Sequence, residues 1–182
     1  MTIVAMILGM NCASFSPKHI PTAYETDSMK GAISDSMPLT RSIPLDKTSS
    51  SLLKRLAKEG NAEDLQYQCV LLELLNVREA EGQQIGVRIF LNLPEANPTT
   101  RFEVPHFVTS FSFAGSNPKI PRDLIFNLKP TVLRLGEELL ETLDQGALTL
   151  TLVPFRFRTK EGAEQSQFDL RAEKLNLVLD CE

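Results

Sequence analysis

A period of two in the apolar residues is the feature that most constrains how this chain can fold. Apolar side chains alternate with polar ones in several short runs, and such alternation is typical of strands that bury one face. Turn-forming residues separate the runs, and no strand–helix–strand rhythm accompanies them, which favours an antiparallel sandwich over a parallel sheet. The clearest runs are Leu65–Leu75, Val87–Leu93, Phe107–Phe113, Leu148–Leu152, Phe155–Arg158 and Leu175–Leu179.

The fold class that follows is all-β: an antiparallel, jelly-roll-like β-sandwich of about 6–7 strands. One short helix is inserted, because Pro130 suits a first helical turn, Gly146 suits a helix end, and leucines repeat at helical spacing between them. Residues 1–60 are rich in Ser, Thr and Pro and are predicted to be a mostly irregular N-terminal arm or linker with one short helix. Residues 61–182 are predicted to be the β-sandwich domain.

The charge and hydropathy of the chain exclude two classes of partner. The net charge is −4, with acidic and basic residues mixed along the sequence. Nucleic acid favours a clustered basic face and anionic lipid favours a polybasic segment, and neither pattern occurs. The apolar run Thr2–Met10 is shorter than the ~20 residues that span a bilayer, and it lacks the basic start of a signal peptide. The sequence therefore predicts no nucleic-acid partner and no membrane association.

Three cysteines, Cys12, Cys69 and Cys181, bear on the compartment. They show no CxxC spacing, and an odd number cannot all pair within one chain, so neither a disulfide framework nor a cysteine zinc site is expected. Cys69 lies in an apolar, strand-like run and is interpreted as a small core residue. This pattern favours a reducing compartment, the cytoplasm.

Independent catalysis has little support in the sequence. The chain has two histidines, His19 and His106, in different regions, and it lacks a Gly-x-Ser-x-Gly elbow, a cysteine beside a histidine and a glycine-rich phosphate loop. His106 is expected to be structural, hydrogen-bonding the loop that Pro105 begins. The phenylalanines of residues 107–113 are expected to pack in the core rather than to stack on bases, since basic residues are not interleaved with them.

A cluster of soft metal ligands occurs near the N-terminus. All five methionines fall within the first 37 residues, and Met6 and Met10 lie close to Cys12 and His19. Thioether and thiolate groups suit Cu(I), so an arm with these four residues could carry copper to a partner. The spacing matches no regular MxxM repeat, and the simpler interpretation is a chance cluster that includes the initiator.

The segment 85–115 carries a specific resemblance. Its stretches VRIFLNLPEANPTT and PHFVTSFSFAG are similar to a strand–loop–strand pattern in the β-rich domain that follows the copper-binding domain of tyrosinases and other type-3 copper proteins. Downstream, FNLKPTVLRLGEELL and LTLTLVP resemble the helix start and next strand of that domain. Four positions depart from the family pattern: Thr109, Ala114, Asn127 and Lys129. The matching positions are Asn92, Pro94, Pro105, His106, Phe107, Ser110, Phe111, Ser112, Phe113 and Gly115.

The resemblance implies the β-domain of a tyrosinase- or polyphenol-oxidase-like protein without its copper-binding domain. A type-3 copper pair in that family needs six histidines on a helical bundle, and this chain has 2. The resemblance therefore implies no cofactor, no catalytic residue and no metal ligand in this chain, with copper held by a partner domain.

The family's β-domain packs over the copper cavity and can project a blocking side chain into it. The resemblance thus implies a non-catalytic domain that caps, stabilises or regulates a tyrosinase-like copper domain, which is either a separate chain or a missing portion. The partner-facing or plug candidates are His106, Phe113, Asn117 and Lys119.

Two other functions stay open at this point. One is a copper-delivery, caddie-like accessory protein that uses the N-terminal arm. The other is an unrelated β-sandwich that binds a small molecule or a protein through its loops. The fold class does not decide among them, because function resides in sites rather than in folds.

Overall fold

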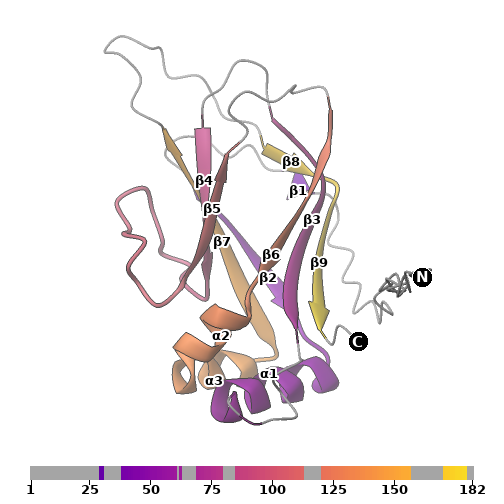
Figure 1. Cartoon of the computed structure of the whole chain (residues 1–182), viewed down its shortest axis with the longest axis vertical. Helices are drawn as coiled ribbons and strands as arrows, with labels where there is room; N and C mark the ends of the chain where they lie inside the picture. Colours follow the sequence, from indigo (N-terminus) through magenta and orange to yellow (C-terminus); the bar gives the residue numbers. More distant parts are fainter. Residues whose placement is uncertain are drawn as a thin grey trace, which may run out of the picture.

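The computed structural model describes residues 29–30, 38–60, 62, 69–79, 85–112, 120–156 and 170–179. These residues form two antiparallel β-sheets with helices at one end (Figure 1), so the predicted all-β sandwich is confirmed. The strands are β1 (Met29–Lys30), β2 (Leu39–Pro44), β3 (Val70–Glu79), β4 (Ile85–Leu91), β5 (Phe107–Ser112), β6 (Arg122–Asn127), β7 (Ala147–Arg156), β8 (Leu170–Ala172) and β9 (Lys174–Leu179). The helices are α1 (Lys47–Glu59), α2 (Lys129–Leu135) and α3 (Glu137–Asp144).

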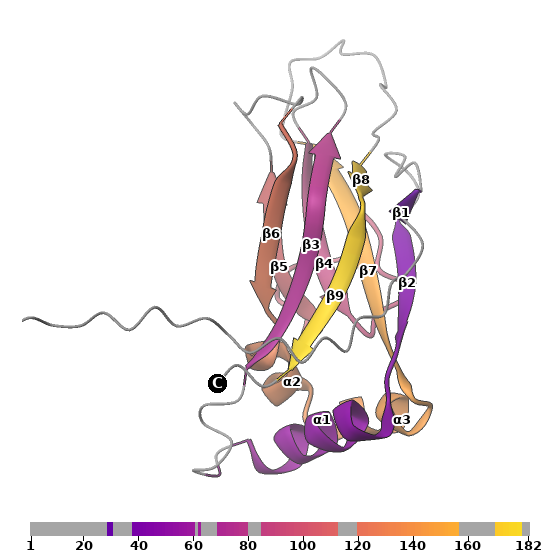
Figure 2. The same cartoon turned by 90° about the vertical axis from the view of Figure 1, so that its right-hand side faces the viewer.

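The two sheets bury a leucine-rich core between them. One sheet has the strand order β2-β7-β4-β5, and the other has β1-β8-β3-β6 with β9 also paired to β3. The sheets lie one in front of the other in Figure 2. Because successive strand residues point to opposite faces, every second residue reaches the core. The fully buried residues that alternate in this way are Leu72 and Leu74 on β3, Val87, Ile89 and Leu91 on β4, and Leu148, Leu150 and Leu152 on β7.

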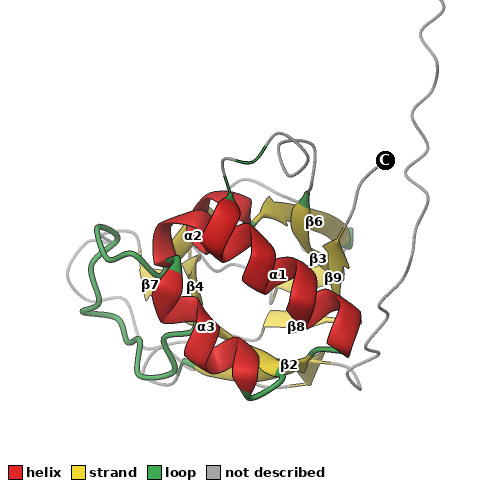
Figure 3. Ribbon diagram, turned by 90° about the horizontal axis from the view of Figure 1, so that it is seen from below, coloured by secondary structure: helices red, strands yellow, loops and turns green. Residues whose placement is uncertain are grey.

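Three helices cover one end of the sandwich, as the view from below shows (Figure 3). Helix α1 buries Leu53 and Leu56, both 0% exposed, in the main core cluster. It begins after Asp46, whose carboxylate accepts a hydrogen bond of 2.6 Å from the Ser49 backbone N–H. This bond satisfies a donor that the first turn leaves free, and it lowers the pKa of Asp46. None of the helices in the described residues is long and apolar enough to cross a membrane.

The segment predicted to form one inserted helix is divided into α2 and α3. Gly136 lies between them with a φ of +51°, a left-handed conformation that glycine adopts without the penalty other residues incur. Its N–H donates to Val132 O at 3.0 Å, the last helical bond of α2, and its positive φ then turns the chain out of the helix. Leu135, Leu139 and Leu143 are still buried. The break therefore lets both helices turn their leucines toward the core.

Part of the predicted arm belongs to the sandwich. Strand β2 pairs with β7 along its whole length, and its Ile43 is buried in the core. The sequence pattern hid β2 because Pro44 ends a run with little alternation. From Leu39 onward the segment expected to be mostly irregular thus forms a strand and a helix, while the residues before it, apart from β1 and Pro38, lie outside the described residues. The domain boundary expected after residue 60 stays a prediction.

The interpretation of Cys69 as a small core residue outside a disulfide framework is wrong. This residue, immediately before β3, is disulfide-bonded. The other two cysteines, Cys12 and Cys181, lie outside the described residues. An odd number of cysteines does not prevent one pair from forming, and the sequence alone leaves the pairing open. Disulfides persist in oxidising compartments, so the cysteines no longer favour a reducing one.

We expect helix α1 to be essential for stability. Leu53→Ala should lower the free energy of unfolding by about 2–5 kcal/mol, because it leaves a cavity in the core at the end of the sandwich that the helices cover. Urea denaturation followed by circular dichroism would measure the loss. Leu133→Ala is the matched control, since Leu133 is 38% exposed and should give a clearly smaller loss. Equal losses in the two variants would show that α1 is not packed as described.

Candidate functional site

The loop between β4 and β5, residues 92–106, is held by two arginines. The Arg88 guanidinium donates to the Pro98 and Thr100 carbonyls at 3.3 and 2.9 Å. On the other side, Arg134 Nε of α2 donates to the Pro105 carbonyl at 2.7 Å. A guanidinium offers five N–H donors, so one arginine can satisfy several loop carbonyls at once. The loop is thereby fixed against both the sheet and the helix.

The outer part of this loop presents an exposed aromatic ring. Asn97 Oδ1 accepts from the Thr99 backbone N–H at 2.9 Å, and the Asn97 N–H donates to Thr100 Oγ1 at 2.9 Å, which makes a tight polar turn. Beyond the turn, Phe102 is 61% exposed. Its ring and that of Phe107 form an edge-to-face pair with 6.4 Å between centroids. An aromatic side chain that a well-bonded loop presents to solvent resembles the anchors of interaction hot spots.

Asn92 forms the junction between β4 and the loop. Its φ of +52° is left-handed, a conformation that asparagine adopts more readily than most residues. Its N–H donates to Thr149 O at 2.7 Å, and its side-chain Oδ1 accepts from the Thr149 N–H at 2.7 Å. The side chain therefore extends the β4–β7 ladder by one residue. The Nδ2 atom is buried and has no hydrogen-bond partner among the described residues.

His106 ends the loop and is bonded on both sides of its ring. Nδ1 lies 2.8 Å from Leu91 O, and Nε2 lies 3.1 Å from Glu138 Oε1 on α3. A carbonyl and a carboxylate both accept hydrogen bonds, so each ring nitrogen of His106 faces an acceptor. The ring thus ties β4 to α3, and the side chain is 13% exposed. These are the contacts of a structural histidine.

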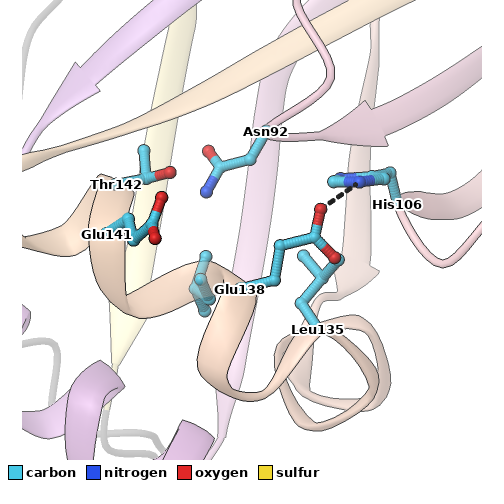
Figure 4. A pocket seen from close by; sticks show the side chains of 7 residues that line it. Asn92, His106, Leu135, Glu138, Glu141 and Thr142 are labelled. Carbon is cyan, nitrogen blue, oxygen red and sulfur yellow. Dashed lines mark hydrogen bonds and ion pairs between the residues drawn. The ribbon is translucent and has the colours of Figure 1, made fainter.

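A cavity of about 190 Å³ lies between Asn92 and α3 (Figure 4). In Figure 4 the Asn92 amide nitrogen points toward α3, while the Glu138 carboxylate points toward His106. Among the described residues, no group of three or more His, Cys, Asp and Glu side chains could hold a metal ion. The side chains that line the cavity are mainly polar or charged. Its lining is Asn92, His106, Glu138, Glu141 and Thr142, with Leu135 and Leu139 supplying apolar surface.

The structure describes only one of the residues predicted for the site. His106 lies at the end of the loop and lines the cavity. The others lie outside the described residues, so the plug and copper-arm assignments stay predictions. They are the plug candidates Phe113, Asn117 and Lys119 and the Cu(I) candidates Met6, Met10, Cys12 and His19.

Sequence reasoning missed the two arginines that hold the loop. Arg88 looked like an ordinary polar position in an alternating strand, and Arg134 like a solvated helix residue. Arg134 bonds a carbonyl 29 residues away, so no local pattern marks it. Asn92 was part of the resemblance, but its role in the ladder depends on Thr149 in a distant strand. The sequence contained one signal of this role: Asn92 is a polar residue that directly follows a regularly alternating strand.

Comparison with solved structures shows which known fold this chain resembles. No family model matches the chain, and no curated protein matches it. Solved structures do match. A recombinantly expressed latent aurone synthase, a polyphenol oxidase, aligns with a TM-score of 0.50 and 16% identity over 79% of this chain and 24% of that chain. The fold is that of part of a polyphenol oxidase.

Two further matches are of the same kind. Latent aurone synthase from its natural source aligns over 88% of this chain at 14% identity and a TM-score of 0.49, and latent apple tyrosinase over 79% at 12% identity and 0.49. The chain spans only 24–27% of the length of these proteins. The match to the recombinantly expressed latent aurone synthase, with its TM-score of 0.50, confirms at the level of the fold the resemblance inferred from the sequence.

We expect the arginines to control the order of the loop. Arg134→Ala should speed amide hydrogen exchange in residues 101–107 about tenfold or more, because a charged donor to the loop backbone is lost. Hydrogen exchange with mass spectrometry would measure it. Arg101→Ala, on the exposed part of the same loop, is the matched control and should leave the exchange unchanged. The same protection in Arg134→Ala as in the wild type would contradict the role of this arginine.

Proposed function

We propose that this chain is a non-catalytic β-domain that docks on a tyrosinase-like type-3 copper domain, caps it and regulates access to its copper site. The observation that carries this proposal is the fold, which is similar to one quarter of a latent polyphenol oxidase. The remaining length of that chain has no counterpart here. A docked copper domain would supply one.

Copper in this proposal belongs to the partner. By family resemblance a type-3 pair needs six histidines, whereas this chain has 2, His19 and His106. His106 is already bonded to Leu91 and Glu138. The chemistry would therefore occur on the partner, and this domain would act by covering it.

The ordered loop supports docking through residues 92–106. Of the four plug candidates, His106 is poorly placed to project into a partner, because its ring is 13% exposed and bonded on both sides. Phe102 on the same loop is 61% exposed and better suited to enter an apolar pocket. Phe113, Asn117 and Lys119 remain candidates for the same role.

Reconstitution with a tyrosinase-like copper domain from the same source tests docking. We expect the two proteins to co-purify and the oxidation of a catechol to slow when this domain is added in excess. Phe102→Ala should weaken binding about 30-fold, the size of a hot-spot truncation. Arg101→Ala, at the neighbouring exposed position, should change it less than about threefold.

Two outcomes separate the parts of this proposal. A strictly monomeric protein that leaves catechol oxidation unchanged would overturn the capping function. Undiminished binding by Phe102→Ala would leave docking intact and remove the loop from the interface.

Copper delivery is the second candidate function. It is favoured by one observation, the placement of all five methionines in the first 37 residues together with Cys12 and His19. Deletion of residues 1–37 should then abolish the transfer of Cu(I) to an apo copper domain, measured against a Cu(I)-chelating competitor. Met6 and Met10 would be the first ligands to substitute. Transfer that survives the deletion would refute this function and leave capping untouched.

A further inference from the structure

Strand β6 has one edge with which no described strand pairs. It pairs with β3 on its other side and forms the edge of its sheet, at the left in Figure 2. Near its end, the Leu128 N–H donates to Val70 O of β3 at 2.7 Å. In an antiparallel ladder, residues alternate between bonding to the partner strand and pointing away from it. Asp123, Ile125 and Asn127, all exposed, therefore turn their main-chain N–H and C=O groups away from β3.

The side chains of β6 are unusually apolar for an exposed edge. Ile125 points away from the core and is 60% exposed. Leu124 and Phe126 point inward but are only partly buried against the core. The charges of β6 are confined to its first two residues, Arg122 and Asp123. Exposed edges are normally protected by lysines, prolines or bulges, and an edge without them can accept another strand.

The other sheet edges are better protected among the described residues. β1 has only 2 residues. On β2 the residue after Pro44 bonds to the β7 side, so Pro44 itself occupies an outward position and supplies no N–H there. On β5 the register with β4 is irregular, and the Phe107 carbonyl already accepts from Thr131 Oγ1 at 3.3 Å and from Arg134. β6 is therefore the edge best suited to accept a further strand.

The outward groups of β6 are complementary to a second copy of the same strand. A two-fold axis through Ile125 sets Ile125 opposite itself and Asp123 opposite Asn127, and each such pair exchanges both of its main-chain hydrogen bonds. On the inner face, Leu124 then lies opposite Phe126. An axis through Leu124 or Phe126 would instead set a polar side chain against Ile125. A slip of one residue would oppose outward groups with groups already bonded to β3.

The polar ends of the strand support the same register. Asp123 Oδ1 accepts from the Asn76 N–H at 2.8 Å, which leaves its second carboxylate oxygen for another donor. Asn127 Oδ1 accepts from the Lys129 N–H at 3.0 Å, so its Nδ2 is the donor that remains for a neighbour. With the axis at Ile125, the Asn127 of each copy faces the Asp123 of the other. The apolar centre thus supplies burial, and the polar ends select the register.

We propose that two copies of this chain associate through β6, so that their two β3-containing sheets become one continuous sheet across a two-fold axis. The same surface is used by both copies, as two-fold symmetry requires. Each copy contributes one strand, so the interface is small and the dimer is weak and concentration-dependent. This surface is separate from the loop that carries Phe102, and the proposal goes beyond the capping function.

Sedimentation equilibrium of this chain alone tests the association. Across about a hundredfold range of concentration, we expect the mean mass to rise from one chain toward two. Ile125→Lys sets two like charges opposite each other and should raise the dissociation constant about tenfold or more. Phe102→Lys is the matched control, because Phe102 is equally exposed at 61% but lies outside β6. It should dimerise as the wild type does.

Amide hydrogen exchange followed by NMR tests the register in the unaltered chain. As the dimer forms, exchange at Ile125 and Asn127 should slow about tenfold, because their N–H groups gain acceptors. Leu124 and Phe126 are already bonded to β3 and should change less. Ile125→Pro removes an outward donor without removing a bond to β3, so it should abolish the dimer and keep the circular dichroism of the wild type.

Three results would overturn the proposal. The first is a mass of one chain at every concentration. The second is equal dimerisation by Ile125→Lys and the wild type, and the third is slower exchange that spares Ile125 and Asn127. Because these measurements use this chain alone, their failure would leave the capping function standing, and failure of capping would leave them valid.

Discussion

The pairing of β4 with β7 is the interaction on which the rest of this structure depends. β4 is hydrogen-bonded on both edges, to β7 and to β5, and its register with β7 runs without a break from Ile85 to Leu91. Because β4 lies between two strands, its backbone N–H and C=O groups are hydrogen-bonded on both sides. The alternation of its side chains buries Val87, Ile89 and Leu91 between the sheets. Asn92 then extends the ladder with its side chain. Loop and cavity both begin where this ladder ends, so their geometry is set by the core.

Local patterns predicted the parts of the fold that local forces determine. Alternation marked β3, β4, β5, β7 and β9, because the period of two reflects burial of one face. The same reasoning did not predict β2. This strand forms because it pairs with β7, which lies more than a hundred residues later in the sequence. It also joined α2 and α3, although Gly136 was visible as a weak point. The disulfide at Cys69 could not be predicted, because cysteine pairing depends on which residues lie close together in space, and the sequence alone does not give this.

The candidate site was less predictable than the fold, because its contacts connect distant segments. The resemblance singled out Asn92 and His106, but it gave neither the bond from Asn92 to Thr149 nor the contact of His106 with Glu138. Arg88 and Arg134 bind backbone carbonyls, and any residue type presents a carbonyl, so no pattern of side chains reveals the acceptor. A polar residue in a strand or on a helix has the same appearance whether it is solvated or holds a loop.

The arginines also bear on how docking would be driven. A flexible loop must lose conformational entropy when it binds, whereas a loop held by Arg88 and Arg134 has already lost it on folding. Phe102 would therefore bind a partner with little further loss of conformational entropy. Asn92 and His106, which line the cavity, belong to the same strand–loop–strand unit. An apolar contact at Phe102 would therefore be made by a preorganised loop, and burial of its ring would supply affinity.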